Sequence, residues 1–232
     1  MIFENQDQVV NAISNGDVIL IDKPSGISSF GVVARVRRYL SQKAGEKIKV
    51  GHTGTLDPFA TGLLILLSGK ATKLSNQFLK LDKWYEATLC LGKTSTTGDP
   101  EGVITEVNVD RQPSYSDIEK ILPDFLGNIK QTVPIFSAVK INGKRAYQLA
   151  RQGQKVEMPT REIEIYELKV LSYHFPELII RTHVSSGTYI RTLGEDLGQA
   201  LGVGAYLTAL RRTKVGNFDL NNAKKLTDFD IS

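Results

Sequence analysis

Cysteine is almost absent from this chain of 232 residues. Cys90 stands alone, so no disulfide can form within the chain, and no Cys/His series has the spacing that binds structural zinc. The longest apolar run, residues 63–67, is too short to cross a bilayer, and the N-terminus lacks the basic and apolar regions of a secretory signal. We therefore expect a soluble cytoplasmic protein without a membrane partner.

Nucleotide-binding motifs are missing as well. The sequence contains no GxxxxGK[ST], GxGxxG or GxSxG motif, and the Gly69-Lys70 pair lacks the upstream glycine of a P-loop. No internal repeat, low-complexity stretch or Ser/Gly/Pro linker divides the chain. One compact domain over residues 1–232 is the expectation.

Acidic residues are scarce in two segments of the chain. The net charge is only +4, but residues 35–49 contain six cations against Glu46 alone, and residues 125–156 contain six cations and no acid. Such clusters can neutralise phosphates. A solvated surface explains them equally well, so charge alone leaves the two interpretations about even.

Hydrophobic periodicity predicts a mixed α and β protein. Alternating or β-branched runs predict strands or buried segments at residues 17–21, 63–67, 84–91, 163–170 and 178–184. Helical spacing predicts a helix capped by Ser28 or Ser29, a helix capped by Ser116 and interrupted at Pro123, and helices at residues 144–151 and 189–201. Residues 51–62 and 94–102 are predicted loops.

The first of these loops, GHTGTLDPFATG, is the most informative stretch. Its three glycines allow sharp turns or a close approach to a ligand, and Pro58 restricts Asp57 to extended conformations. The loop is therefore predicted to present one carboxylate from a stiff backbone. A plain Asp-Pro turn is the alternative.

This loop resembles the catalytic motif of the bacterial TruB-type tRNA pseudouridine synthases, in which the aspartate is indispensable. Further matches follow in the family's order: IDKP at 21–24, KWYEA at 83–87, SAVK at 137–140, YQLAR at 147–151, SGTYIR at 186–191 and LRRT at 210–213. The chain departs from the family at Val133-Pro134-Ile135-Phe136 and at Gln148, and the C-terminal PUA-type domain of most bacterial relatives is expected to be absent.

The resemblance implies an α+β fold, with a large mixed, mostly antiparallel sheet flanked by helices and loops and a basic RNA-gripping insertion at about 130–160. It implies an isomerase that converts a flipped-out uridine of the tRNA T-loop, at position 55, into pseudouridine without a metal or other cofactor. The expected partner is the tRNA T-stem-loop, and we expect a monomer with no obligatory protein partner. An RNA-binding module that has lost turnover is the alternative.

The resemblance also implies roles for individual residues. The expected catalytic residues are Asp57 as the carboxylate, Arg191 as the cation that balances its charge, and Tyr85 as the aromatic that stacks on the flipped base and assists at C5. The other substrate-binding candidates are His52, Tyr189 and Leu210 at the nucleotide, and Lys23, Lys140, Arg151 and Arg211 at phosphates. Simpler alternatives are contact with solvent or a neighbouring acid for Arg191, strand packing for Tyr85, core packing for Leu210 and a backbone hydrogen bond for His52. Cys90, His174 and His183 are assigned to structure.

Overall fold

The computed structural model describes residues 16–137, 139–141, 143–152 and 156–230, apart from the side chains of Tyr147 and Arg151. The chain divides into two compact units. Met1–Tyr85 with Leu210–Ser232 form the first unit, and Glu86–Ala209 form the second. The residues of the matched motifs belong to both units, since Asp57 lies in the first unit and Arg191 in the second.

Ten strands form the main sheet in the described part of the chain, which confirms the predicted α+β class. The first unit contains the order β14-β1-β3-β12, and the second contains β12-β4-β11-β10-β7, because β4 and β12 supply residues to both. Strand β2 pairs with β3, and β13 with β12. The bounds are β1 Val18–Lys23, β2 Val50–His52, β3 Thr61–Ser68, β4 Lys83–Leu91, β7 Gly127–Thr132, β10 Thr160–His174, β11 Glu177–Val184, β12 Ala205–Val215, β13 Phe218–Asp219 and β14 Lys224–Lys225.

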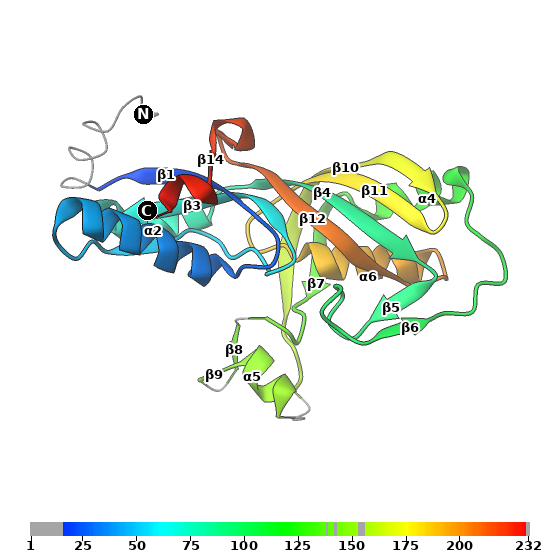
Figure 1. Ribbon diagram of the computed structural model, residues 1–232. Coiled ribbons are helices and arrows are strands. Elements are labelled where there is room, and N and C mark those ends of the chain that lie inside the picture. The colour runs from blue at the N-terminus through cyan, green and yellow to red at the C-terminus, as the bar shows by residue number, and fades with distance from the viewer. Residues whose placement is uncertain (1–15, 138, 142, 153–155, 231–232) are drawn as a thin grey trace. The chain divides into compact units, whose positions relative to one another are not determined.

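Helix α2, Ser29–Ala44, is the main helix of the first unit. The Ser28 hydroxyl accepts a hydrogen bond from the Gly31 amide, which confirms the predicted cap. Its buried side chains, Val32, Val33, Val36 and Leu40, recur at helical spacing. The helix contacts the 3₁₀ helix η4, Leu226–Phe229, as Figure 1 shows. The short helices η1 (Gly69–Leu74), α3 (Ser75–Leu79) and η3 (Leu220–Asn222) complete this unit.

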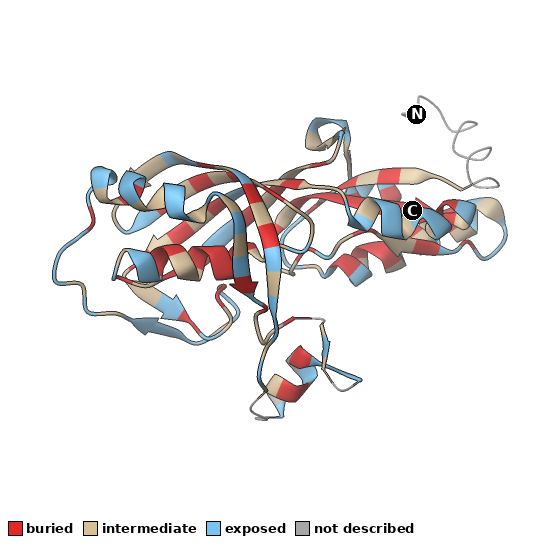
Figure 2. Cartoon of the chain, turned by 180° about the vertical axis from the view of Figure 1, so that it is seen from behind, coloured by how far each residue is buried: buried red, intermediate tan, exposed pale blue. Residues whose placement is uncertain are grey.

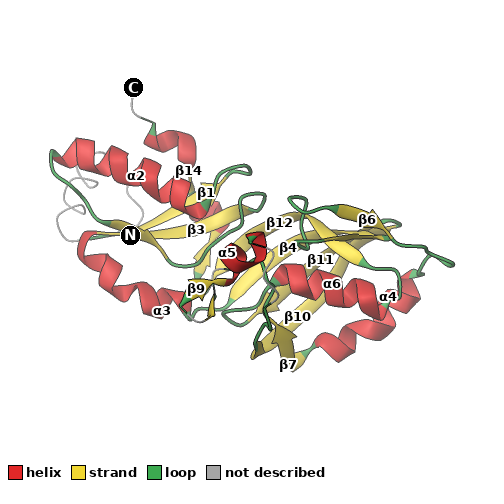
Figure 3. Cartoon of the chain, turned by 90° about the horizontal axis from the view of Figure 1, so that it is seen from below, coloured by secondary structure: helices red, strands yellow, loops and turns green. Residues whose placement is uncertain are grey.

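Helix α6, Ile190–Ala200, packs on the strands of the second unit. A side chain at Gly194 would lie 3.2 Å from Leu207 of β12 and 3.4 Å from Leu89 of β4, so the helix approaches both strands closely. Figure 2 shows its buried side, and Figure 3 shows the helix among the strands of this unit. The remaining helices of the unit are α4 (Tyr115–Ile121), η2 (Leu122–Phe125) and α5 (Ala146–Arg151).

Several local predictions need correction. The predicted loop at residues 94–102 is wrong at its start, because β5, Lys93–Ser95, pairs with β6, Ile104–Glu106. The helix near residue 116 is capped by Ser114 with Asp117 rather than by Ser116, although it does give way to a 3₁₀ turn at Pro123. The helix predicted from residue 144 begins later, because β8, Lys140–Ile141, pairs with β9, Lys144–Arg145. Gly153, a glycine just beyond this helix that is typical of a helix end, lies outside the described residues.

No helix in the described part of the chain is long and apolar enough to span a membrane.

Candidate active site

Asp57 lies half-buried in a loop between β2 and β3, which we call the catalytic loop, residues 53–60. Leu56, the residue before it, is held by the Ser29 hydroxyl. The Leu56 amide donates to Ser29 Oγ at 2.8 Å, and that hydroxyl donates to the Leu56 carbonyl at 2.8 Å. The Ala60 amide donates to the Asp57 carbonyl at 3.1 Å and closes the turn. The backbone on both sides of the carboxylate is therefore fixed.

Lys23 anchors the other side of this loop. Its side chain is fully buried, and Nζ donates to the carbonyl oxygens of Pro24 at 2.9 Å, Ile27 at 2.7 Å and Pro58 at 3.1 Å. An ammonium group has three N–H donors, so these carbonyls match its full capacity. The predicted phosphate contact does not fit this buried position. Lys23 instead ties the end of β1 to the residue that follows Asp57.

Arg212 is another buried cation of the first unit, and no role was predicted for it. Only 2% of the residue is exposed. Its Nε donates to the Leu63 carbonyl at 2.8 Å, and Nη2 donates to the Gly54 carbonyl at 3.1 Å. The guanidinium therefore contacts the backbone of the catalytic loop at Gly54 and that of β3 at Leu63.

His52 lies half-buried at the end of β2. The Gly54 amide donates to His52 Nδ1 at 3.4 Å, so Nδ1 is an acceptor and the neutral ring carries its proton on Nε2. Burial, and then the positive charge of Arg212, lower the pKa of His52. The structure thus favours a neutral imidazole with a backbone hydrogen bond.

Tyr85 and Leu210 are both buried, each with 7% exposure. Tyr85 is in β4 and Leu210 in β12, so both are compatible with the packing roles considered as alternatives. Arg211 is more exposed than its neighbours. Its Nη2 pairs with Asp22 Oδ2 at 2.8 Å, and Nη1 donates to the Thr61 hydroxyl at 3.3 Å. This pairing neutralises part of the charge that was predicted to meet a phosphate.

Arg191 has a buried carboxylate partner within the second unit. Nη1 lies 3.2 Å from Asp99 Oδ2, and the two side chains are 6% and 5% exposed. Nη1 also donates to the Thr97 carbonyl at 2.7 Å, and Nη2 donates to the Phe136 carbonyl at 2.9 Å. The guanidinium plane is therefore fixed by three groups. The considered alternative, a neighbouring acid, is present, while the pairing of Arg191 with Asp57 stays a prediction.

Tyr189 is positioned by Gln131, another residue that the sequence did not single out. The Tyr189 amide donates to Gln131 Oε1 at 2.8 Å, and Gln131 Nε2 donates to the Tyr189 carbonyl at 3.0 Å. The Arg161 guanidinium lies 5.2 Å from the centre of the Tyr189 ring. Because Tyr189 directly precedes α6, the same contacts fix the start of the helix that carries Arg191.

The two predicted cations of the insertion lie in its small secondary-structure elements. Lys140 is exposed in β8, as a phosphate contact requires. Arg151 ends α5, but its side chain lies outside the described residues. Ala138 of the SAVK motif is outside them too, as is Lys155 of the basic cluster.

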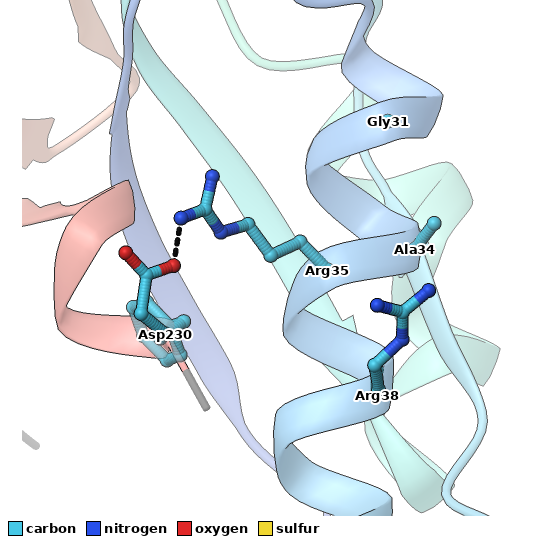
Figure 4. A pocket seen from close by; sticks show the side chains of 6 residues that line it. Gly31, Ala34, Arg35, Arg38 and Asp230 are labelled. Carbon is cyan, nitrogen blue, oxygen red and sulfur yellow. Dashed lines mark ion pairs between the residues drawn. The ribbon is translucent and has the colours of Figure 1, made fainter. Parts of the chain in front are cut away.

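A separate cavity of about 550 Å³ lies on α2. Gly31, Ala34, Arg35 and Arg38 line it from the helix, and Phe229 and Asp230 line it from the C-terminal segment. Figure 4 shows Arg35 paired with Asp230 across this cavity. None of the predicted site residues lines it. Of the two arginines that line the cavity, Arg35 and Arg38, the first is thus already paired with an acidic residue of the protein itself.

Three residues whose contacts support the candidate site were not predicted from the sequence: Asp99, Gln131 and Arg212. Asp99 stands in a polar Gly-Asp-Pro turn that gives no sign of a buried partner. Arg212 is part of the LRRT match, which drew attention to it as a motif but not as a buried donor. In the described part of the chain, no group of three His, Cys, Asp or Glu side chains could hold a metal ion.

Comparisons with known proteins agree with these matches. Residues 37–190 match the N-terminal domain model of the TruB family pseudouridylate synthases, and residues 191–231 match the tRNA pseudouridylate synthase B C-terminal domain. The tRNA pseudouridine synthase B of Desulfotalea psychrophila is 48% identical over 220 residues, which cover 92% of this chain and 87% of that protein. The same enzyme of Phocaeicola vulgatus is 44% identical over 215 residues, which cover 92% of each.

A solved structure shares the fold. The crystal structure of a Cbf5-Nop10-Gar1 complex contains a chain that is similar with a TM-score of 0.72 and 31% identity, covering 95% of this chain and 55% of that one. The family models together match nearly all of the described residues. This chain therefore belongs to the TruB family of pseudouridylate synthases, which are isomerases.

Proposed function

We propose that this protein converts a uridine in the T-loop of tRNA, at position 55, into pseudouridine, with Asp57 as the catalytic carboxylate. The observation that carries the proposal is the catalytic loop itself. It places the family's GTLDP sequence in a segment whose backbone is hydrogen-bonded on both sides of Asp57. The names of the relatives, tRNA pseudouridine synthase B, support tRNA as the substrate.

The reaction breaks the N1–C1′ bond, turns the freed uracil, joins its C5 to C1′ and releases the C5 proton. Nothing is oxidised or hydrolysed, so the reaction itself requires no redox cofactor. Its demanding step leaves the sugar electron-deficient. A carboxylate relieves that deficiency by covalent attack or by its charge, as in glycoside hydrolysis, and this is the role we propose for Asp57.

Arg191 is proposed to keep Asp57 ionised during this step. A guanidinium stays charged at any physiological pH, and one beside a carboxylate typically lowers its pKa by roughly 1–3 units. Asp99 and the two backbone carbonyls support this role because they fix the orientation of Arg191. Asp99 is then a positioning residue, since it acts through Arg191.

The remaining predicted residues are proposed to hold the extruded nucleotide. Tyr85 stacks on the flipped base, Tyr189 and Leu210 line the uracil pocket, and His52 contacts the displaced nucleotide through Nε2–H. Lys140, Arg151 and Arg211 meet phosphates, which contributes affinity and salt dependence rather than base recognition. We propose that the protein does this as a monomer, without a protein partner.

Release of tritium from a tRNA transcript that carries C5-tritiated uridine tests the proposal, because the label reaches water only when C5 loses its proton. Asp57→Asn should abolish release and keep tRNA binding within a few-fold of wild type. Asp110→Asn, a change of an exposed aspartate in the second unit, is the matched control and should leave release unchanged. Release at the wild-type rate from Asp57→Asn would refute the assignment. Tight binding without release by the wild-type protein would favour the RNA-binding module instead.

A further inference from the structure

We propose that Arg212 is a positioning residue for catalysis. Its guanidinium binds the Gly54 and Leu63 carbonyls and thereby holds the catalytic loop that carries Asp57. The inference rests on the proposed function, since it assumes that the position of Asp57 limits the reaction rate. It concerns a residue outside the roles proposed above.

The hydrogen bonds of Arg212 join the two ends of the loop. Gly54 stands three residues before Asp57 and Leu63 stands six residues after it, and the two donors reach them at 3.1 and 2.8 Å. A planar guanidinium offers donors in a fixed fork, so the two carbonyls are held at a set separation. The distance between Gly54 and Leu63 therefore depends on the Arg212 side chain.

Gly54 and Gly62 both lie beside Arg212, and at Gly62 there is no room for a side chain. At Gly62, where φ is +100°, a Cβ would lie 2.3 Å from the Arg212 carbonyl oxygen, far inside van der Waals contact. At Gly54, where φ is +143°, a Cβ would lie 3.6 Å from Arg212 Nη1. Arg212 also pairs directly with Gly62 in the parallel ladder of β12 and β3. The backbone of Arg212 thus pairs with β3 at Gly62, and its side chain reaches back to Gly54 in the catalytic loop.

The charge of Arg212 has no carboxylate partner among the described residues, and its contacts are carbonyl oxygens. Burying a cation without a counter-charge lowers the stability of the fold, so we infer that Arg212 has a role that offsets this cost. Burial lowers the pKa of His52 and of Lys83, and the charge of Arg212 lowers both further.

The test compares single-turnover tritium release at saturating tRNA with the Kd for tRNA. Arg212→Lys keeps the charge and loses the fork, and Arg212→Met loses both. Misplacement of a reacting group by about 1 Å can cost roughly 100-fold in rate, so we expect that loss for Arg212→Met and a smaller loss, about 10-fold, for Arg212→Lys. The Kd should stay within a few-fold of wild type.

Leu40→Ala is the control for lost stability. Leu40 is 3% exposed in α2 of the same unit, so its truncation to alanine lowers the stability of that unit. The change is not in the catalytic loop. Assayed at a temperature where circular dichroism shows it to be folded, it should retain the wild-type rate. If Arg212→Met does not fold, Arg212→Lys carries the test alone under the same criterion.

Two results would overturn the inference. One is a wild-type rate in the folded Arg212 variants, and the other is a loss confined to Kd. Asp57→Asn is run in parallel to separate this failure from failure of the proposed function. An inactive Asp57→Asn beside fully active Arg212 variants removes only the positioning role, whereas an active Asp57→Asn removes the proposed function itself.

Discussion

Arg191 and Arg212 are both buried arginines that donate to two backbone carbonyls, but only Arg191 has a carboxylate beside it. Asp99 lies 3.2 Å from Arg191 in the second unit, whereas Arg212 in the first unit meets the Gly54 and Leu63 carbonyls. Carbonyl oxygens orient a guanidinium without neutralising it. Removal of Arg191 therefore leaves a buried negative charge, while removal of Arg212 leaves two polar groups that are uncharged.

Among the changes that test this comparison of the two arginines, Arg191→Lys is expected to have the largest effect on the reaction. Lysine keeps the positive charge near Asp99 but loses the planar fork that also reaches the Thr97 and Phe136 carbonyls. We expect tritium release to fall roughly 100-fold or more, the size of effect seen when one transition-state donor is removed. Single-turnover kinetics provide the measurement, and near-normal turnover would refute the pairing of Arg191 with Asp57.

Asp99→Asn sharpens the comparison by replacing the carboxylate beside Arg191 with an uncharged amide. Breaking one partner of a buried ion pair typically costs about 3–5 kcal/mol, so the free energy of unfolding should fall by that order. Asp22→Asn, which breaks the partly exposed pair with Arg211, is the matched control and should cost no more than about 1 kcal/mol. Urea denaturation measures both, and equal losses would show that burial of the pair at Asp99 is energetically unimportant.

Ser29→Ala tests how far the catalytic loop depends on its hydroxyl anchor. The change leaves the buried amide and carbonyl of Leu56 without the partner that they share, at a cost of about 1–3 kcal/mol in unfolding free energy. Ser114→Ala removes an exposed capping hydroxyl from the second unit and should cost about 1 kcal/mol. Only the first change should also slow tritium release. Equal rates in the two variants would mean that this anchor does not position Asp57.

The last expected effect is a pH dependence of stability that depends on Lys83, a buried cation near Arg212. Burial, and then the charge of Arg212, lower its pKa from 10.5 to about 8. Between these two values the unfolded chain binds a proton that the folded protein has lost, so stability rises with pH across that range. Below pH 8 or so, Lys83 is protonated in both the folded and the unfolded chain, so its contribution to stability no longer changes with pH.

Urea denaturation of wild type and Lys83→Met at several pH values checks this sign. The stability of wild type relative to the variant should increase as the pH is raised from about 8 toward 10.5. A constant difference would show that the Lys83 ammonium keeps its ordinary pKa. The ammonium donates to the Leu79 and Leu81 carbonyls, so the charged form does have partners below that range.

The elements that follow from strong periodicity were predictable, and the contacts between distant residues were not. The buried residues of helix α2 recur at helical spacing and those of strand β3 form a continuous run, so their sequences suffice to predict both elements. Strand β12 was not predicted, because three consecutive buried residues at its start, Ala205–Leu207, break the alternation of a half-buried strand. Without that strand, nothing distinguishes Arg211, which is partly exposed, from Arg212, which is buried.

The site residues show the same limit. Lys23 and Arg211 are both cations in family motifs, and the sequence assigned both to phosphates. Only the fold shows that the Lys23 ammonium is enclosed by three carbonyls, one of them from Pro58, 35 positions away. Likewise, the contact of Arg191 with Thr97 joins residues 94 positions apart, which no local pattern can report.

The double hydrogen bond at Ser29 has a thermodynamic consequence for turnover. Ser29 is the first residue of α2, so the residue next to Asp57 is coupled to a helix of 16 residues. Disorder of that segment would require the first turn of the helix to open. The entropy of ordering it is therefore lost once, when the chain folds, and does not have to be lost again each time a substrate arrives.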